Sequence, residues 1–226
     1  MLKFLSFLLM AKVKILTHIL YRGNKQWLSE EREESYKDVR LIVFLNHTSL
    51  FEPLFIRFSS WRLLWNVAHK VIVPGADVTM RRPLAGRMLK ALLPGVIPIS
   101  RKQDESWQYF LSMVGQDGVI TAILPEGRMK RANGLDKAGK PMSVRGGVAE
   151  ILEKLEQGKI LFIYSGGLHH IQSPGDIFPK LFKCISANLE IIDIPTYKAS
   201  LSAISGKNFK AKVMADMDQR LLDCVP

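Results

Sequence analysis

The sequence has few cysteines, no apolar run long enough to cross a bilayer, and no repeat or Gly/Ser-rich linker. Only two of its 226 residues are cysteines, Cys184 and Cys224, and they do not share C-x-x-C spacing. This scarcity excludes a disulfide framework and a cysteine-based metal knuckle, and it favours a reducing compartment. The absence of a linker predicts a single globular domain after the N-terminal segment.

Acidic residues are also in short supply. Lys and Arg number 32 against 21 Asp and Glu, which gives a net charge of +11 and a pI near 9.7. A basic excess of this size indicates an anionic partner: nucleic acid, anionic lipid headgroups or a phosphorylated substrate. We do not expect nucleic acid, because the cations are scattered and neither a binding motif nor interleaved aromatic residues accompany them.

The N-terminal segment is apolar over residues 1–11 and is then interrupted by Lys12, Lys14 and His18. No A-x-A-like site follows, and the two lysines lie where a signal-peptide cleavage region is small and neutral. We therefore expect residues 1–23 to form a helix in the membrane interface, with a core helix of the domain as the alternative. The residues expected to insert into the lipid are Phe4, Phe7, Leu8, Ile15 and Ile19.

The remaining residues, 24–226, are expected to form one α/β domain. A polar connection over residues 24–38 precedes a series of short apolar runs that alternate with helical patterns. This alternation predicts a mixed, partly parallel sheet flanked by helices. The expected strands are 39–45, 63–68, 96–99, 118–124, 160–164 and 189–194, and the expected helices are 53–60, 84–93, 105–114, 148–156 and 217–222.

A histidine and a carboxylate directly follow the first of these strands. His47 and Glu52 lie five residues apart in Asn46–Pro53. The ordinary pKa of histidine is close to neutrality, so His47 is a candidate general base. A carboxylate on the far ring nitrogen would fix the tautomer and stabilise the imidazolium that forms.

Cations follow two further strands, at the sheet edge where ligands gather in open α/β folds. Arg101 follows the 96–99 run after Ser100, and Arg128 follows the turn Pro125-Glu126-Gly127. The planar guanidinium of arginine donates two parallel hydrogen bonds, which suits a phosphate group. Glu126 is expected to orient such an arginine or to hold a substrate hydroxyl.

Together these segments resemble the motifs of the lysophosphatidic acid acyltransferase family, which includes 1-acylglycerol-3-phosphate acyltransferases and related glycerolipid acyltransferases. The family motif N-H-x-S-x-x-D is matched by Asn46, His47 and Ser49, with Glu52 at the acidic position. The motif G-x-x-P-I-x-R is matched by Gly95, Pro98, Ile99 and Arg101. The motif F-P-E-G-T-R-S is matched by Pro125, Glu126 and Gly127, and Val144-Arg145-Gly146-Gly147 resembles F-K-x-G. The matches keep the family's order over residues 40–165.

The chain departs from the family pattern at two places in these motifs. Glu52 stands where the family has Asp, which gives an H-x4-E motif with one extra methylene before the carboxylate. Arg128-Met129 stands where the family has Thr-Arg. We therefore expect Arg128 to take the place of the family's phosphate-binding arginine, one position early. The same change leaves open an acyltransferase whose acceptor carries no phosphate.

The resemblance implies an enzyme that moves a fatty acyl group from acyl-CoA or acyl-carrier protein to a hydroxyl of lysophosphatidic acid or a similar lysophospholipid. It implies that His47 is the general base and that Glu52 orients it, without a covalent acyl-enzyme. The implied substrate-binding residues are Asn46, Ser49, Arg101, Glu126, Gly127, Arg128 and Arg145. No cofactor or metal is expected. The enzyme would lie peripherally on an anionic membrane surface, at the cytoplasmic face.

Each of these residues also has a simpler interpretation. Ser49-x-x-Glu52 fits a helix-capping box, although Pro53 argues against a helical conformation for the residue before it. Arg101 could be a solvated residue at the end of a strand, and Arg128 part of an exposed basic turn. The Glu52 change also leaves open a lipid-binding protein that has lost its catalytic activity. His169, His170 and Cys184 do not have the spacing of a metal site.

Overall fold

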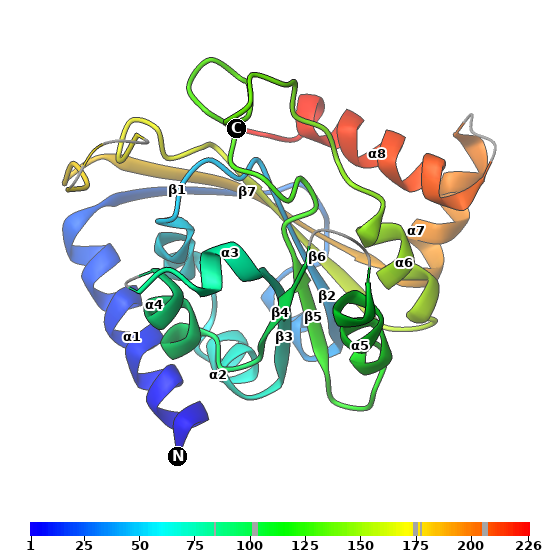
Figure 1. Cartoon of the computed structure of the whole chain (residues 1–226), viewed down its shortest axis with the longest axis horizontal. Coiled ribbons are helices and arrows are strands. Elements are labelled where there is room, and N and C mark those ends of the chain that lie inside the picture. The colour runs from blue at the N-terminus through cyan, green and yellow to red at the C-terminus, as the bar shows by residue number, and fades with distance from the viewer. Residues whose placement is uncertain (84, 101–103, 174–175, 177, 205–207) are drawn as a thin grey trace.

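A seven-stranded sheet forms the middle of the molecule (Figure 1), which a computed structural model describes over residues 1–83, 85–100, 104–173, 176, 178–204 and 208–226. The strand order is β1-β7-β6-β2-β5-β3-β4. All neighbouring strands are parallel except β6 and β7. The strands are β1 (Arg22–Trp27), β2 (Val39–Leu45), β3 (Val71–Ala76), β4 (Val96–Ile99), β5 (Ile120–Ile123), β6 (Lys159–Ser165) and β7 (Cys184–Asp193).

Helices cover both faces of this sheet, and the residues of β2 alternate between the two layers. Leu41, Val43 and Leu45 pack into a core shared with α5 (Glu105–Met113), α6 (Gly147–Lys154), α7 (Ile194–Ser200) and α8 (Phe209–Asp223). Ile42 and Phe44 face the opposite layer. That layer contains α1 (Leu2–Leu20), η1 (Glu33–Asp38), η2 (Glu52–Phe58), α2 (Trp61–Lys70) and α4 (Ala85–Leu92). Two short helices, α3 (Asp77–Met80) and η3 (Leu201–Ala203), complete the described elements.

The α/β layering expected from the sequence is confirmed. The strands expected at 39–45, 96–99, 118–124 and 160–164 are present as β2, β4, β5 and β6. The last expected strand is longer at its start and forms β7, in which buried and partly exposed residues alternate. The helix expected over 217–222 is the end of the longer α8, and the one expected over 53–60 is the 3-10 helix η2.

The strand expected over 63–68 is wrong, because these residues belong to helix α2. The Ser60 hydroxyl accepts a hydrogen bond from the N–H of Leu63 and caps the helix. Leu64 and Ala68 are buried one turn apart, while Trp65 between them is exposed. This i, i+4 pattern is helical, and the short apolar run concealed it.

Two strands were not expected from the sequence. β3 contains Pro74 and Gly75, which are rare inside strands. Here Val71 and Ile72 pair with β5, whereas the residues from Val73 onward pair with β4 alone, so Pro74 needs no hydrogen bond to a second neighbour. β1 is an exposed, polar edge strand that pairs only with β7. Its first two residues, Arg22 and Gly23, were expected in the N-terminal helix, and the rest lie in the stretch expected as a connection.

The N-terminal helix α1 packs one face on the domain and exposes apolar side chains on the other. Its inner face buries Ser6, Met10 and Thr17 against the domain, and Phe7 packs edge-on against Trp65 with ring centroids 5.1 Å apart. The outer face leaves a row of large apolar side chains exposed to solvent: Leu2, Phe4, Leu5, Leu8, Ile15, Leu16 and Ile19. In the described part of the chain, helices are too short or too polar to span a bilayer.

Candidate active site

Three neighbouring parallel strands bring their carboxyl ends together at one edge of the sheet. β2 lies between β6 and β5 in the strand order. Asn46 and His47 directly follow β2, Glu126 follows β5, and residues 165–172 leave β6. Because parallel strands end at the same edge, segments far apart in the sequence meet around His47.

Asn46 joins these three segments. Its φ of 67° places it in the left-handed region, which Asn tolerates better than most residues other than Gly. In this conformation its N–H donates to Oε1 of Glu126 at 2.6 Å, and its side-chain amide donates to the carbonyl of Ser165 at 2.7 Å. Asn46 therefore fixes the turn that carries His47 to the ends of both neighbouring strands.

His47 faces Glu52 across a short contact. Nδ1 of His47 lies 3.1 Å from Oε1 of Glu52, and both side chains are largely buried. The same oxygen accepts the N–H groups of Thr48 and Ser49, each at 2.9 Å. The His47–Glu52 contact is close but lacks the alignment of a full hydrogen bond, a looseness that substrate-free active sites commonly show.

Glu52 has features of both interpretations made from the sequence, the residue that orients His47 and the acidic residue of a capping box. In a capping box the acidic side chain bonds back to the N–H of the serine three residues earlier, as Glu52 does to Ser49. The serine hydroxyl, however, accepts from the N–H of Phe51 rather than from that of Glu52. One carboxylate oxygen thus holds the turn and faces the imidazole at the same time.

The surroundings of His47 favour its protonated form. Burial lowers the pKa of His47, but the contact with Glu52 and the negative charges of Glu52 and Glu126 outweigh it and raise the pKa overall. Since Nδ1 faces a carboxylate, the proton of the neutral imidazole belongs on Nδ1. The other nitrogen, Nε2, makes no hydrogen bond with the described residues and is left to accept a proton.

Glu126 has a different environment from the one expected. Its side chain is 1% exposed, and its carboxylate accepts the N–H groups of Asn46 and His47. Burial raises the pKa of Glu126, although these hydrogen bonds and the charge of His47 act in the opposite direction. This carboxylate holds the backbone of the turn that carries His47, a task that the sequence did not predict.

Arg145 lies against the turn that contains Glu126. Its N–H donates to the carbonyl of Pro125 at 2.9 Å. Gly127 has a φ of 63°, and a Cβ built on it would lie 3.1 Å from Cδ of Arg145. Gly127 therefore allows both the left-handed turn and the close approach of Arg145. The structure brings these two predicted site residues together.

Arg128 is held by a partner that the sequence did not reveal. Its guanidinium forms an ion pair with Asp136, whose side chain is 3% exposed. Asp136 also accepts the N–H groups of Ala138 and Lys140, which lower the pKa of its carboxyl together with Arg128. The charge of Arg128 is thus compensated within the protein. No motif around Arg128 identified Asp136, because it lies eight positions further along the chain and a folded loop brings the two together.

The segment 165–172 forms a further wall of the site. The N–H of Leu168 donates to the hydroxyl of Thr48 at 2.9 Å, and the Ser49 hydroxyl donates to Oε1 of Gln172 at 2.8 Å. His169 bonds through Nε2 to the carbonyl of Lys130, whose own N–H donates to the carbonyl of His47 at 2.7 Å. In the sequence, this wall was marked only by the paired histidines His169 and His170, which do not have the spacing of a metal site.

Arg101 lies outside the described residues. The strand before it, β4, is separated from β2 by β5 and β3 in the strand order. Among the residues that the structure describes, His, Cys, Asp and Glu side chains do not gather in a group of three or more that could hold a metal ion.

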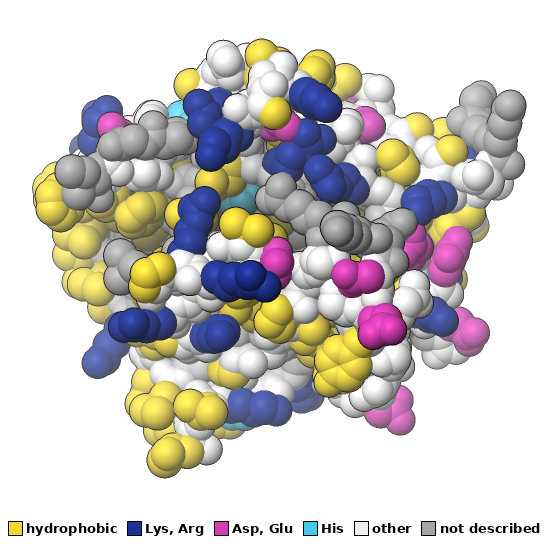
Figure 2. All heavy atoms as spheres, in the orientation of Figure 1, with side chains coloured by type: hydrophobic (Ala, Val, Ile, Leu, Met, Phe, Trp, Pro, Cys, Tyr) yellow, Lys and Arg dark blue, Asp and Glu magenta, His cyan; other side chains and the backbone are white. Residues whose placement is uncertain are grey.

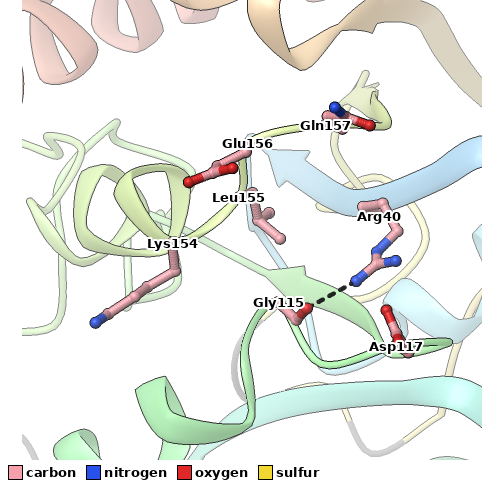
Figure 3. A pocket seen from close by; sticks show the side chains of 7 residues that line it. All are labelled: Arg40, Gly115, Asp117, Lys154, Leu155, Glu156 and Gln157. Carbon is pink, nitrogen blue, oxygen red and sulfur yellow. Dashed lines mark hydrogen bonds between the residues drawn. The ribbon is translucent and has the colours of Figure 1, made fainter.

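A hollow at the opposite edge of the sheet does not belong to this site. Figure 3 shows it between Arg40 near the start of β2, Gly115 and Asp117 before β5, and Leu155 after α6. Arg40 donates to the carbonyl of Gly115 at 3.2 Å there. Arg40 is the second residue of β2, and Gly115, Asp117 and Leu155 precede β5 or β6, whereas His47 follows β2, so the hollow lies at the far end of the sheet.

Comparisons with known proteins give a family and a fold. The model of the family described as Acyltransferase matches residues 28–170. Among solved structures, the chain resembles the 1-acyl-sn-glycerophosphate (LPA) acyltransferase PlsC from Thermotoga maritima, with a TM-score of 0.55 and 14% identity. The match covers 93% of this chain and 77% of that one. The search of curated proteins found no match.

Proposed function

The chain belongs to the acyltransferase family, and on that premise we propose that it transfers a fatty acyl group from a thioester to a hydroxyl of lysophosphatidic acid or a similar lysophospholipid. The observation that carries this proposal is the placement of His47, with Nδ1 3.1 Å from a carboxylate oxygen that two backbone N–H groups also hold. Acyl-CoA and acyl-carrier protein both present the required thioester.

In this mechanism Nε2 of His47 removes the proton of the acceptor hydroxyl as its oxygen attacks the thioester carbonyl carbon. Glu52 stabilises the imidazolium that forms and keeps the ring in position. The tetrahedral intermediate then breaks its C–S bond, and the departing thiolate takes the proton from the imidazolium. The products are the ester and a free thiol, so no covalent acyl-enzyme and no further reactant are needed.

His47→Ala tests this mechanism. We expect acyl transfer to fall by at least about a thousandfold, because the base and the imidazolium are both lost. The readout is thiol release by detergent-solubilised protein with lysophosphatidic acid as the acceptor. His18→Ala is the matched control, since His18 is an exposed histidine on α1. Retained activity in His47→Ala would remove His47 as the base.

The ion pair of Arg128 favours a second candidate, an acyltransferase of this family whose acceptor carries no phosphate. An arginine already neutralised by Asp136 has less charge to offer a phosphate group. In this case Arg128→Ala would leave the acceptor KM nearly unchanged. If Arg128 exchanges Asp136 for the acceptor phosphate, the same change would raise KM about tenfold or more, the loss of a charged hydrogen bond.

The same assay separates these candidates when the acceptor is varied. Lysophosphatidic acid is compared with a monoacylglycerol that lacks the phosphate. A preference for lysophosphatidic acid that disappears in Arg128→Ala assigns the phosphate to Arg128. A preference that survives in this variant assigns it to another cation of the site, for which Arg145 beside Gly127 is the first choice.

We further propose that α1 holds the enzyme at a membrane surface, on the cytoplasmic face. The outer face of α1 exposes large apolar side chains from Leu2 to Ile19, with Lys3, Lys12 and His18 exposed among them. A row of large apolar side chains is normally buried, and here the domain covers only the other face of the helix. A bilayer surface would cover the other face, with lysines such as Lys12 at the headgroups.

A further inference from the structure

A second exposed apolar segment lies beside the end of α1. Phe178, Leu181 and Phe182 are 80%, 44% and 69% exposed. The N–H of Phe182 donates to the carbonyl of Leu20, the last residue of α1, at 2.8 Å. The 178–182 segment therefore continues the apolar surface that ends at Ile19. Figure 2 shows hydrophobic side chains gathered along the edge of the molecule that α1 forms in Figure 1.

Cations are interspersed with these apolar side chains. Lys180 lies within the segment, Lys183 directly follows it, and Arg22 is joined to Lys183 by a backbone hydrogen bond of 2.9 Å. All three side chains are exposed, and none forms an ion pair with the described residues. Apolar side chains beside unpaired cations complement an anionic lipid surface, where lysine meets the headgroups.

The backbone of Phe182 is strained. Its φ of 60° is in the left-handed region, which bulky side chains rarely adopt and which costs on the order of 1 kcal/mol or more. Asn or Gly would occupy this position with less strain. The protein nevertheless places an aromatic ring here and exposes it, which indicates that the ring meets something outside the chain.

Hydrogen bonds connect this segment to the active site. The N–H of Lys180 donates to the carbonyl of Ile171 at 2.7 Å. Ile171 belongs to the 165–172 wall, which contacts Thr48 and Ser49 beside His47. The position of the 178–182 segment is thereby coupled to the 165–172 wall of the site.

We propose that the 178–182 segment inserts into the same anionic lipid surface as α1 and forms a second, separate membrane contact. Two contacts joined at Leu20 would fix the orientation of the domain on the bilayer. With α1 alone, the domain could still rotate about the axis of that helix. A second copy of this chain is a poorer occupant, because like patches would bring cations against cations. The proposal rests on the membrane placement of α1 given above, but it concerns different residues.

Phe182→Asn combined with Phe178→Ser tests the segment. Both side chains are exposed, and Asn suits the left-handed position, so the melting temperature should be unchanged or higher. Partitioning onto vesicles of mixed phosphatidylcholine and phosphatidylglycerol, measured by co-sedimentation, should fall roughly tenfold or more, as expected for losing two inserted rings. Tyr109→Ser, which removes an exposed aromatic side chain from α5, is the control and should bind as the parent does.

Two outcomes would overturn the inference. One is a double variant that binds the vesicles as tightly as the parent. The other is a parent protein that sediments as a dimer while the double variant sediments as a monomer, because a second copy of the chain would then cover the segment. Leu5→Ser with Leu8→Ser tests α1 in parallel. If only that pair releases the protein from vesicles, α1 binds the membrane and the 178–182 segment does not. No substrate is present, so failure of the acyl-transfer reaction would leave this result intact.

Discussion

At the scale of single residues, the one carboxylate of Glu52 contacts both the His47 side chain and the backbone of the turn that follows His47. Its Oε1 faces the imidazole of His47 and accepts the N–H groups of Thr48 and Ser49. The longer side chain of Glu, compared with Asp, reaches both groups from the first residue of η2. Orientation of the imidazole and closure of the turn that carries it therefore depend on one oxygen atom, so a change at Glu52 affects both.

The pH dependence of acyl transfer should report the environment of His47. The base must be neutral to accept a proton, so kcat/KM should rise with pH and reach half its maximum above the ordinary histidine pKa of 6.5, because the pKa of His47 is raised. Glu52→Gln removes the negative charge that contributes to this shift. We expect the midpoint to move to lower pH and the plateau to fall by about a hundredfold to ten thousandfold.

Glu52→Asp is the matched control for this profile. It keeps the charge, so the midpoint should stay above that of Glu52→Gln even if the shorter side chain lowers the plateau. Coinciding profiles for the parent and Glu52→Gln would contradict the assignment. The raised pKa also means that His47 stabilises the fold while it is protonated. This contribution is complete below pH 6.5 and is lost as the pH rises through the folded-state pKa.

Sequence motifs predict the residues of this site better than their contacts. His47 and Glu52 could be found from their spacing, because both belong to one local turn. The partners of Glu126 and Arg128 could not be found in this way, because each contact depends on which distant segment folds next to that residue. Glu126 meets Asn46 through the pairing of β2 with β5, and Asp136 reaches Arg128 through a folded loop. A sequence shows that a carboxylate is present but not which buried N–H groups will donate hydrogen bonds to it.

At the scale of elements, a cluster of charged side chains around Arg220 joins α8 to the sheet. Arg220 of α8 donates to Glu190 of β7 at 2.6 Å and to the hydroxyl of Tyr164 in β6 at 2.8 Å. It also donates to Asp216 within its own helix, and its guanidinium lies 4.8 Å from the ring centroid of Phe162. The next residue of β6 after Tyr164 is Ser165, whose carbonyl holds Asn46. Packing of α8 thus supports the strand end that holds the turn carrying His47.

Arg220→Met should destabilise the fold strongly. The change leaves Glu190 and Asp216 partly buried without their cation, and breaking such a pair costs about 3–5 kcal/mol. Unfolding by urea, followed by circular dichroism, measures the loss. Arg62→Met is the control, because Arg62 is an exposed arginine on α2 that forms no ion pair with the described residues. An equal, small loss in both variants would show that the cluster is not a structural anchor.

At the scale of the whole molecule, hydrophobic patterns predict the layers but not every strand. β2 and β6 are buried on both faces, so their continuous apolar runs were plain in the sequence. β1 is an edge strand whose side chains mostly face solvent, and it carries little apolar signal. The helix expected at residues 1–23 forms over Leu2–Leu20 as α1, whereas Arg22 and Gly23 belong to β1, and the inner face of α1 packs on the domain as the alternative predicted. Membrane contact of its outer face stays a prediction.

The net charge of +11 and the apolar face of α1 should contribute separately to membrane binding. Salt shortens the range of electrostatic attraction, from about 10 Å at 0.1 M to about 3 Å at 1 M, and leaves apolar burial in place. Each cation near an anionic surface contributes about 1 kcal/mol, so partitioning onto phosphatidylglycerol-containing vesicles should fall by about a hundredfold or more over this range. A residual, salt-independent affinity should remain and should be lost in Leu5→Ser with Leu8→Ser. Partitioning that does not change with salt would show that the basic surface faces away from the membrane, and the excess charge would then belong to recognition of the anionic substrates.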